Sequence, residues 1–128
     1  MGATALVTPE DIVKGKEIVR ALDASGFLVR SAFWFYIPDG EEWRLILATP
    51  KVDELGPRGA YATAQQVLRT LPGKIEFEHI TLVSPNDPLV KLLRVAVGTP
   101  PDALADIRFT KNVINNVLIE DAYIYRSS

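Results

Sequence analysis

Two strand-forming segments joined by a turn constrain the fold of this chain more than any other feature. Residues 27–37 and 43–49 are rich in aromatic and aliphatic side chains. Between them stand Pro38, Asp39 and Gly40, residue types that favour turns. Two such segments separated by a few turn residues predict an antiparallel β-hairpin.

The alternation of side chains along the first strand predicts one apolar face and one amphipathic, aromatic face. The face expected to point to the core contains Phe27, Val29, Phe33, Phe35 and Ile37. The opposite face is aromatic as well, so a helix, another chain or a ligand must cover it. We expect that face, with the last hairpin, to form a homodimer interface made by Arg30, Trp34, Tyr36, Tyr123 and Tyr125.

Capping and turn residues predict three helices around these strands. Thr8 and Pro9 begin the first helix, which Ser25 and Gly26 end. Gly56 and Pro57 mark the start of a second helix, after a polar connection over residues 50–55. Asp87 is the expected N-cap of a third, over residues 89–97, which is apolar on most sides and therefore expected to be deeply packed.

Further strands are predicted between and after the helices. A third strand lies within residues 75–83, most securely from His79 or Ile80 onward. Residues 107–125 read as a second hairpin, with Asn115 and Asn116 as its turn because Asn tolerates positive φ. A helix over residues 112–120 is the competing interpretation.

The predicted order of elements is therefore α-β-β-α-β-α-β-β. This order indicates an α+β fold with a mostly antiparallel sheet of about five strands and the helices gathered on one face. At 128 residues we expect a single domain over the whole chain, with residues 1–7 flexible.

Composition narrows the classes of function. The net charge is −2, from 14 basic and 16 acidic residues spread along the chain, which disfavours nucleic acid as a partner. No apolar run approaches the ~20 residues of a membrane span, and no secretory signal is apparent. There is no cysteine, which excludes thiolate metal sites and fits a reducing compartment. We therefore expect a cytoplasmic protein without a membrane partner.

Catalytic and metal-binding motifs are not evident in the sequence. His79 is the only histidine, and on a regular strand it would face away from Glu76 and Glu78. That geometry favours a structural or surface histidine. We identify no catalytic residue, no metal site and no cofactor motif.

One group of residues is a candidate ligand site. Lys51, Glu54, Arg58 and Tyr61 lie where the second strand leads into the second helix. Arg58 stands in a first helical turn, where free N–H groups already favour anions. The sequence leaves two alternatives open: an ion pair of Arg58 with Asp53 or Glu54, or an anionic ligand.

The function that the sequence favours is non-catalytic: an interaction or accessory domain that self-associates and also accepts another protein partner. The alternative is a ligand-binding domain, or a hydrolase or nuclease, that acts on a phosphate-bearing substrate. A third class, nucleic-acid binding, would use the aromatic face together with Arg30 and Arg44.

Overall fold

The structure is a computed structural model that describes residues 7–72 and 77–128. Its helices are α1 (Pro9–Ala24), α2 (Lys51–Leu68) and α3 (Pro88–Ala96), with a short 3₁₀ helix η1 (Phe77–His79). Its strands are β1 (Ser31–Ile37), β2 (Glu42–Ala48), β3 (Ile80–Val83), β4 (Ile107–Ile114) and β5 (Val117–Ser127). The predicted α+β class and order of elements are confirmed.

All five strands form one sheet in the order β3-β2-β1-β5-β4. The predicted first hairpin lies at its centre, and β5 pairs with the free side of β1. The β2–β3 pair is parallel, so the sheet is mixed rather than wholly antiparallel. The reason is the connection: α2 carries the chain back to the starting end of the sheet, so β3 runs the same way as β2.

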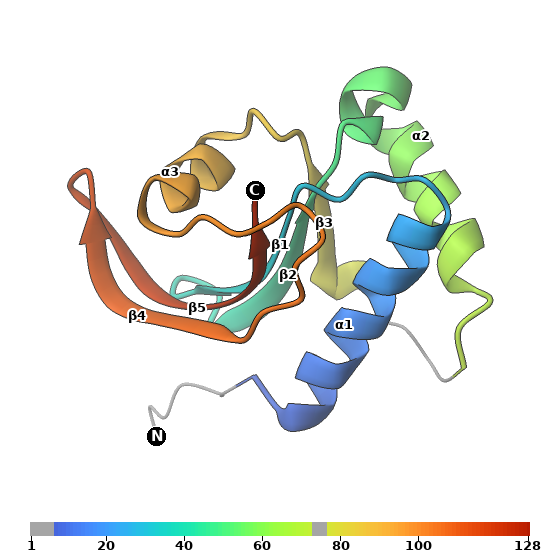
Figure 1. Cartoon of the computed structure of the whole chain (residues 1–128). Helices are drawn as coiled ribbons and strands as arrows, with labels where there is room; N and C mark the ends of the chain where they lie inside the picture. The colour runs from blue at the N-terminus through green and yellow to red at the C-terminus, as the bar shows by residue number, and fades with distance from the viewer. Residues whose placement is uncertain (1–6, 73–76) are drawn as a thin grey trace.

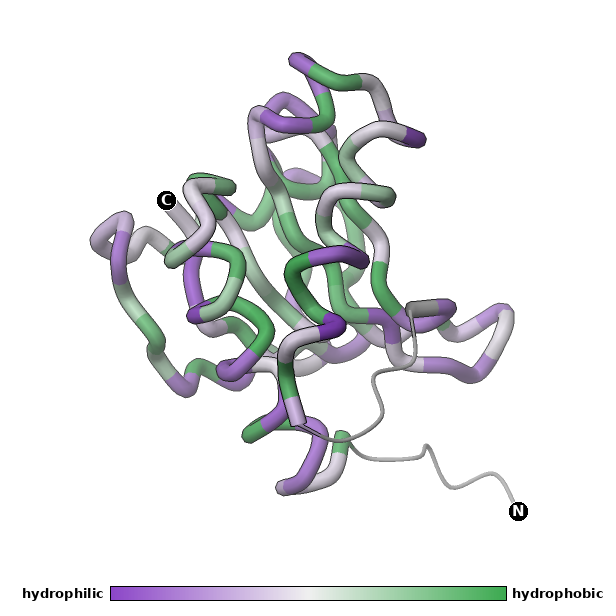
Figure 2. Tube along the Cα trace, turned by 90° about the vertical axis from the view of Figure 1, so that its right-hand side faces the viewer, coloured by the Kyte–Doolittle hydropathy of each residue, from purple (hydrophilic) through white to green (hydrophobic). Residues whose placement is uncertain are grey.

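Helices cover both faces of the sheet, and our expectation that they gather on one face is wrong (Figure 1). One buried cluster joins α1 and α2 to one face, and includes Leu22, Trp34 and Leu47. A second joins α3 to the other face, and includes Phe33 and Leu93. Figure 2 shows the hydrophobic stretches gathered where these layers meet. Both faces of the first hairpin are therefore core.

The first strand begins at Ser31, four residues later than predicted. Leu28 has a φ of 55°, which interrupts the extended chain before β1. Phe27 and Val29 consequently share the α1 side of the sheet with Trp34, whereas Phe33 lies on the α3 side. The predicted grouping of Phe27 and Val29 with Phe33 is wrong, because the alternation of side chains in a regular strand does not continue through this break.

Two predicted helices differ in detail from the structure. Residues 51–55 are already helical, and the left-handed Gly56 (φ 75°) separates them from the segment that Pro57 begins. The third helix is capped by Asp87 as predicted but is packed on one side only. Val90 and Leu93 are buried, whereas Val95 is 67% exposed. The deep packing that we expected is wrong because α3 lies on the surface of the sheet rather than inside it.

The second hairpin is confirmed. Asn115 and Asn116 have φ values of 49° and 68°, as a two-residue hairpin turn with two left-handed residues requires. Residues 112–120 are therefore strand and turn, and the helical interpretation is wrong.

The predicted range of the third strand, residues 75–83, begins with two residues, 75 and 76, that lie outside the described residues. Of the first seven residues, which we expected to be flexible, only Val7 is described, and it is buried.

A bulge in β5 brings Tyr125 into the core. The β1–β5 register shifts between Ala32 and Phe33, which gives β5 one extra residue there. The Tyr125 hydroxyl accepts a hydrogen bond from Trp34 Nε1 (2.9 Å) and donates one to the carbonyl of Ile12 in α1 (2.8 Å). Gly15 permits this approach, since a Cβ there would lie within 2.8 Å of the Tyr125 ring.

The next residue of β5, Arg126, is a buried cation. Its guanidinium donates to both carboxylate oxygens of Asp23 (3.1 and 3.0 Å), at the end of α1. It also donates to the carbonyls of Val29 and Ala103, both at 2.9 Å. One side chain therefore joins the last strand to α1, to the segment before β1 and to the connection before β4.

Gly15→Ala tests the contact between Tyr125 and α1. Helix propensity alone favours Ala over Gly by about 1 kcal/mol. We expect the opposite sign, a loss of about 1–3 kcal/mol in the free energy of unfolding, because the methyl group overlaps the tyrosine ring. Urea denaturation measures the change. Val13→Ala, on the exposed side of the same helix, is the control and should be close to neutral; a stabilised Gly15→Ala protein would contradict the packing.

Candidate functional site

Of the residues predicted to bind an anionic ligand, Lys51, Glu54 and Tyr61 have partners within the protein. Lys51 and Glu54 form an ion pair one helical turn apart, at 3.5 Å. Asp53, an expected partner of Arg58, instead accepts a hydrogen bond from Ser84 Oγ (3.0 Å). Arg58 is exposed, and no ion-pair partner for it is present in residues 7–72 and 77–128. The predicted helix-start pair of Arg58 with Asp53 or Glu54 is wrong.

Tyr61 has a structural position at the edge of the sheet. Its hydroxyl donates to the carbonyl of Ile80 (3.2 Å) and accepts from the N–H of Leu82 (3.0 Å). These backbone groups belong to β3, the edge strand beside β2. A strand edge with unpaired backbone groups is a template for another strand. Tyr61 therefore closes this edge.

Most of the aromatic residues that we assigned to an interface lie inside the protein. Trp34, Tyr36 and Tyr125 are 8%, 6% and 0% exposed, and α1 covers the hydroxyl of Tyr125. Of the three alternatives for covering the face of Trp34, a helix is the one observed. Arg30 is exposed and Tyr123 is half-buried. The dimer itself stays a prediction.

Tyr123 belongs to a polar network at the start of β4. Asp106 accepts hydrogen bonds from Tyr123 Oη (2.5 Å) and from Lys16 Nζ (3.0 Å). The bond from Lys16 and then that from Tyr123 hold the pKa of the Asp106 carboxyl below its ordinary value of 3.8. Burial, with the bond to Asp106, raises the pKa of Tyr123 to about 12. The network anchors α1 to the sheet.

A second network lies on β4 and β5. Arg108 makes a bidentate pair with Asp121, through Nε (2.6 Å) and Nη2 (2.5 Å), and lies 5.9 Å from the centre of the Trp43 ring. The pair with Asp121 raises the pKa of Arg108. Thr110 Oγ1 also donates to Asp121 (3.1 Å). Arg108 and Thr110 on β4 therefore supply the partners of the buried Asp121 carboxylate on β5.

The β4–β5 hairpin ends in an apolar tip, which we define as Val113, Val117 and Leu118. These residues are 65%, 46% and 57% exposed. Val113 and Leu118 are directly opposite each other across the two strands. In Figure 1 the hairpin curves around α3 and its turn lies at the side of the molecule away from α1.

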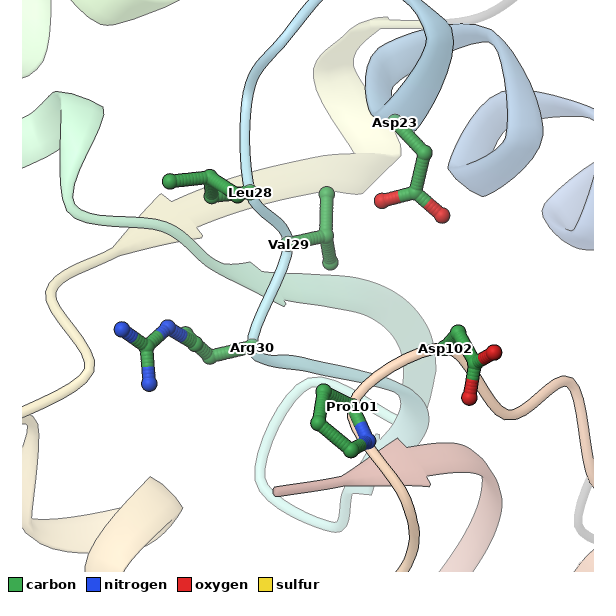
Figure 3. A pocket seen from close by; sticks show the side chains of 6 residues that line it. All are labelled: Asp23, Leu28, Val29, Arg30, Pro101 and Asp102. Atoms are coloured by element: carbon green, nitrogen blue, oxygen red, sulfur yellow. The ribbon is translucent and has the colours of Figure 1, made fainter.

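A cavity of about 550 Å³ lies where three distant segments meet. Figure 3 shows the side chains around it, which come from the end of α1, the segment before β1 and the connection before β4. They are Asp23, Leu28, Val29, Arg30, Pro101 and Asp102. Its volume is in the range of sites that bind small molecules, roughly 300–1000 Å³.

Metal and membrane features are absent from the described part of the chain. Residues 7–72 and 77–128 contain no group of three or more His, Asp or Glu side chains placed to hold a metal ion. His79 lies in η1 rather than in a strand and is half-buried. Among the described helices, none is both long and apolar enough to span a bilayer.

No protein-family model matches the chain, and comparisons with curated proteins and with solved structures found no match either. The function must therefore be argued from the geometry of the apolar tip and of the cavity. Sequence reasoning named the last hairpin as part of an interface but not its apolar tip, and it missed the cavity. The available signal for the tip was the apolar residues on both sides of the Asn115-Asn116 turn.

Tyr61→Phe tests whether Tyr61 closes the β3 edge. Removal of the hydroxyl leaves the Leu82 N–H and the Ile80 carbonyl unsatisfied, at a cost of about 1–2 kcal/mol in the free energy of unfolding. We also expect faster exchange of the Leu82 amide proton. Thr63→Val removes a hydroxyl that bonds within α2 and is the control. An unchanged Leu82 exchange rate would contradict the assignment.

Asp106→Asn tests the Lys16–Asp106–Tyr123 network through its pH dependence. Because folding lowers the pKa of Asp106, its contribution to stability is present above the unfolded value and is lost as the pH falls through the folded value. Wild type should be more stable than Asp106→Asn at about pH 5.5, and the difference should shrink towards about pH 2.5. Urea denaturation at both pH values measures it. A difference that stays constant or grows in acid would be inconsistent with the network.

Proposed function

We propose that this chain is a non-catalytic association domain that forms a homodimer through the apolar tip. The observation that carries the proposal is the exposure of Val113, Val117 and Leu118 at the end of a projecting hairpin. An exposed group of large apolar side chains is typical of a protein-interaction site. The absence of cysteine supports a cytoplasmic setting for this association.

Charge favours a second copy of the chain as the partner. The tip and the turn that it encloses, residues 112–118, contain no ionisable side chain. A neutral apolar patch is complementary to itself, which a twofold interface requires. The net charge of −2 is too small for strong repulsion between two copies.

The sheet edges are less suited to association than the tip. Tyr61 closes the β3 edge. On the β4 edge, Lys111 has a φ of 49° and Asn112 Nδ2 donates to the carbonyl of Thr110 (2.9 Å). A lysine and an irregular backbone are common protections against edge-to-edge pairing. Contact through side chains of the tip is therefore favoured over extension of the sheet.

The alternative function, action on a phosphate-bearing substrate, has weaker support. Lys51 is paired with Glu54, and the Tyr61 hydroxyl is used by β3. Arg58 alone remains as an anion ligand in the predicted group. Arg44 donates to Thr81 Oγ1 (2.7 Å), which also weakens the case for nucleic-acid binding through Arg30 and Arg44.

Light scattering on Leu118→Lys tests the proposal. At about 50 μM, above typical micromolar dissociation constants, wild type should have twice the mass of one chain and Leu118→Lys the mass of one. Val13→Lys is the matched control, since Val13 is 58% exposed on α1 and should leave the dimer intact. A monomeric wild type would refute the dimer; a dimeric, folded Leu118→Lys would refute the apolar tip as its interface.

A further inference from the structure

We infer that the cavity beside Leu28 binds a small zwitterion with an apolar middle, the chemical class of short apolar peptides. This inference is independent of the apolar tip, which belongs to another part of the chain. It rests on the shape of the cavity, the order of charges around it and the conformation of Leu28.

The charges are arranged at opposite ends. In Figure 3 the carboxylates of Asp23 and Asp102 lie to one side of Val29, and the Arg30 guanidinium lies to the other. Within the described residues, Arg30 and Asp102 have no ion-pair partner. Asp23 is 36% exposed while its oxygens accept from Arg126. Because Asp23 is already paired with Arg126, an ammonium group of a ligand fits Asp102, and a carboxylate fits the Arg30 guanidinium.

Apolar side chains separate these two ends. Leu28, Val29 and Pro101 supply the apolar part of the lining. In Figure 3 Val29 and Pro101 lie between the acidic groups and the Arg30 guanidinium, and Leu28 lies on the side of the guanidinium. A ligand with charge throughout would lose hydration against these residues without compensation. A ligand that is apolar in the middle and charged at its ends matches the order of the lining side chains.

Leu28 is held in a conformation that leucine seldom adopts. Its φ is 55°, and the residue, which lines the cavity, is 62% exposed. Left-handed backbone at a bulky residue is unfavourable, and such strain concentrates at ligand sites. Glycine would relieve this strain, and because Leu28 lines the cavity we assign its side chain to contact with the ligand.

The walls of the cavity are fixed before any ligand arrives. Arg126 bonds to Asp23 in one wall, to the carbonyl of Val29 in the second, and to the carbonyl of Ala103, next to Asp102, in the third. Because one buried guanidinium joins all three segments, little ordering is required on binding. A preformed site loses less entropy when it binds its ligand.

Titration with leucyl-leucine, followed by backbone amide NMR, tests the inference. At concentrations up to about 10 mM we expect saturable shifts at the amides of the lining residues. N-acetyl-leucyl-leucine lacks the ammonium group and leucyl-leucine amide lacks the carboxylate. Each should bind about tenfold more weakly, since each loses one charge-assisted contact. Absence of saturable shifts, or equal binding of all three compounds, would overturn the inference.

Three variants assign the contacts. In Arg30→Gln, leucyl-leucine should no longer bind more tightly than leucyl-leucine amide. In Asp102→Asn, leucyl-leucine should no longer bind more tightly than N-acetyl-leucyl-leucine. Arg20→Gln, an exposed arginine of α1 outside the cavity, should change neither. Leu28→Gly should raise or preserve the thermal midpoint while it weakens binding. A Leu28→Gly protein that binds as wild type does, or an Arg30→Gln protein that still prefers the acid, would show that the ligand lies elsewhere.

Discussion

The buried guanidinium of Arg126 is the contact on which the arrangement of this molecule depends. A charge removed from water is costly unless its hydrogen bonds are supplied by the protein. Here Asp23 neutralises the charge, and two backbone carbonyls accept further donors. These partners come from the end of α1, from the segment before β1 and from the connection before β4. The ends of three segments are therefore held at one point, and the cavity lies between them.

The bulge at Tyr125 turns the last strand so that Arg126 can reach this position. An extra residue in β5 places Tyr125 against α1, where Gly15 leaves room for the ring. Trp34 and Ile12 satisfy both hydrogen-bonding capacities of its hydroxyl. Trp34, Tyr36 and Tyr125 are thereby buried within the protein. The proposed interface is therefore at the end of the second hairpin rather than on the centre of the sheet.

The two edges of the sheet are protected against strand pairing, whereas the hairpin end exposes apolar side chains. Tyr61 satisfies the backbone of β3, and Lys111 and Asn112 interrupt the edge of β4, so neither edge offers a long open ladder. The apolar tip, by contrast, leaves Val113 and Leu118 in solvent. This contrast supports the proposed association through side chains of the tip rather than through strand pairing.

Local signals determined much of this structure. Caps at Thr8 and Asp87, and turns at Pro38–Gly40 and Asn115-Asn116, were readable because each depends on residues adjacent in the chain. The order of elements followed from them. Tertiary structure alone decided which face each helix covers, the parallel direction of β3 and the assembly of the cavity. Those features depend on contacts between residues about a hundred positions apart, such as Arg126–Asp23. Local patterns in a single sequence do not reveal such contacts.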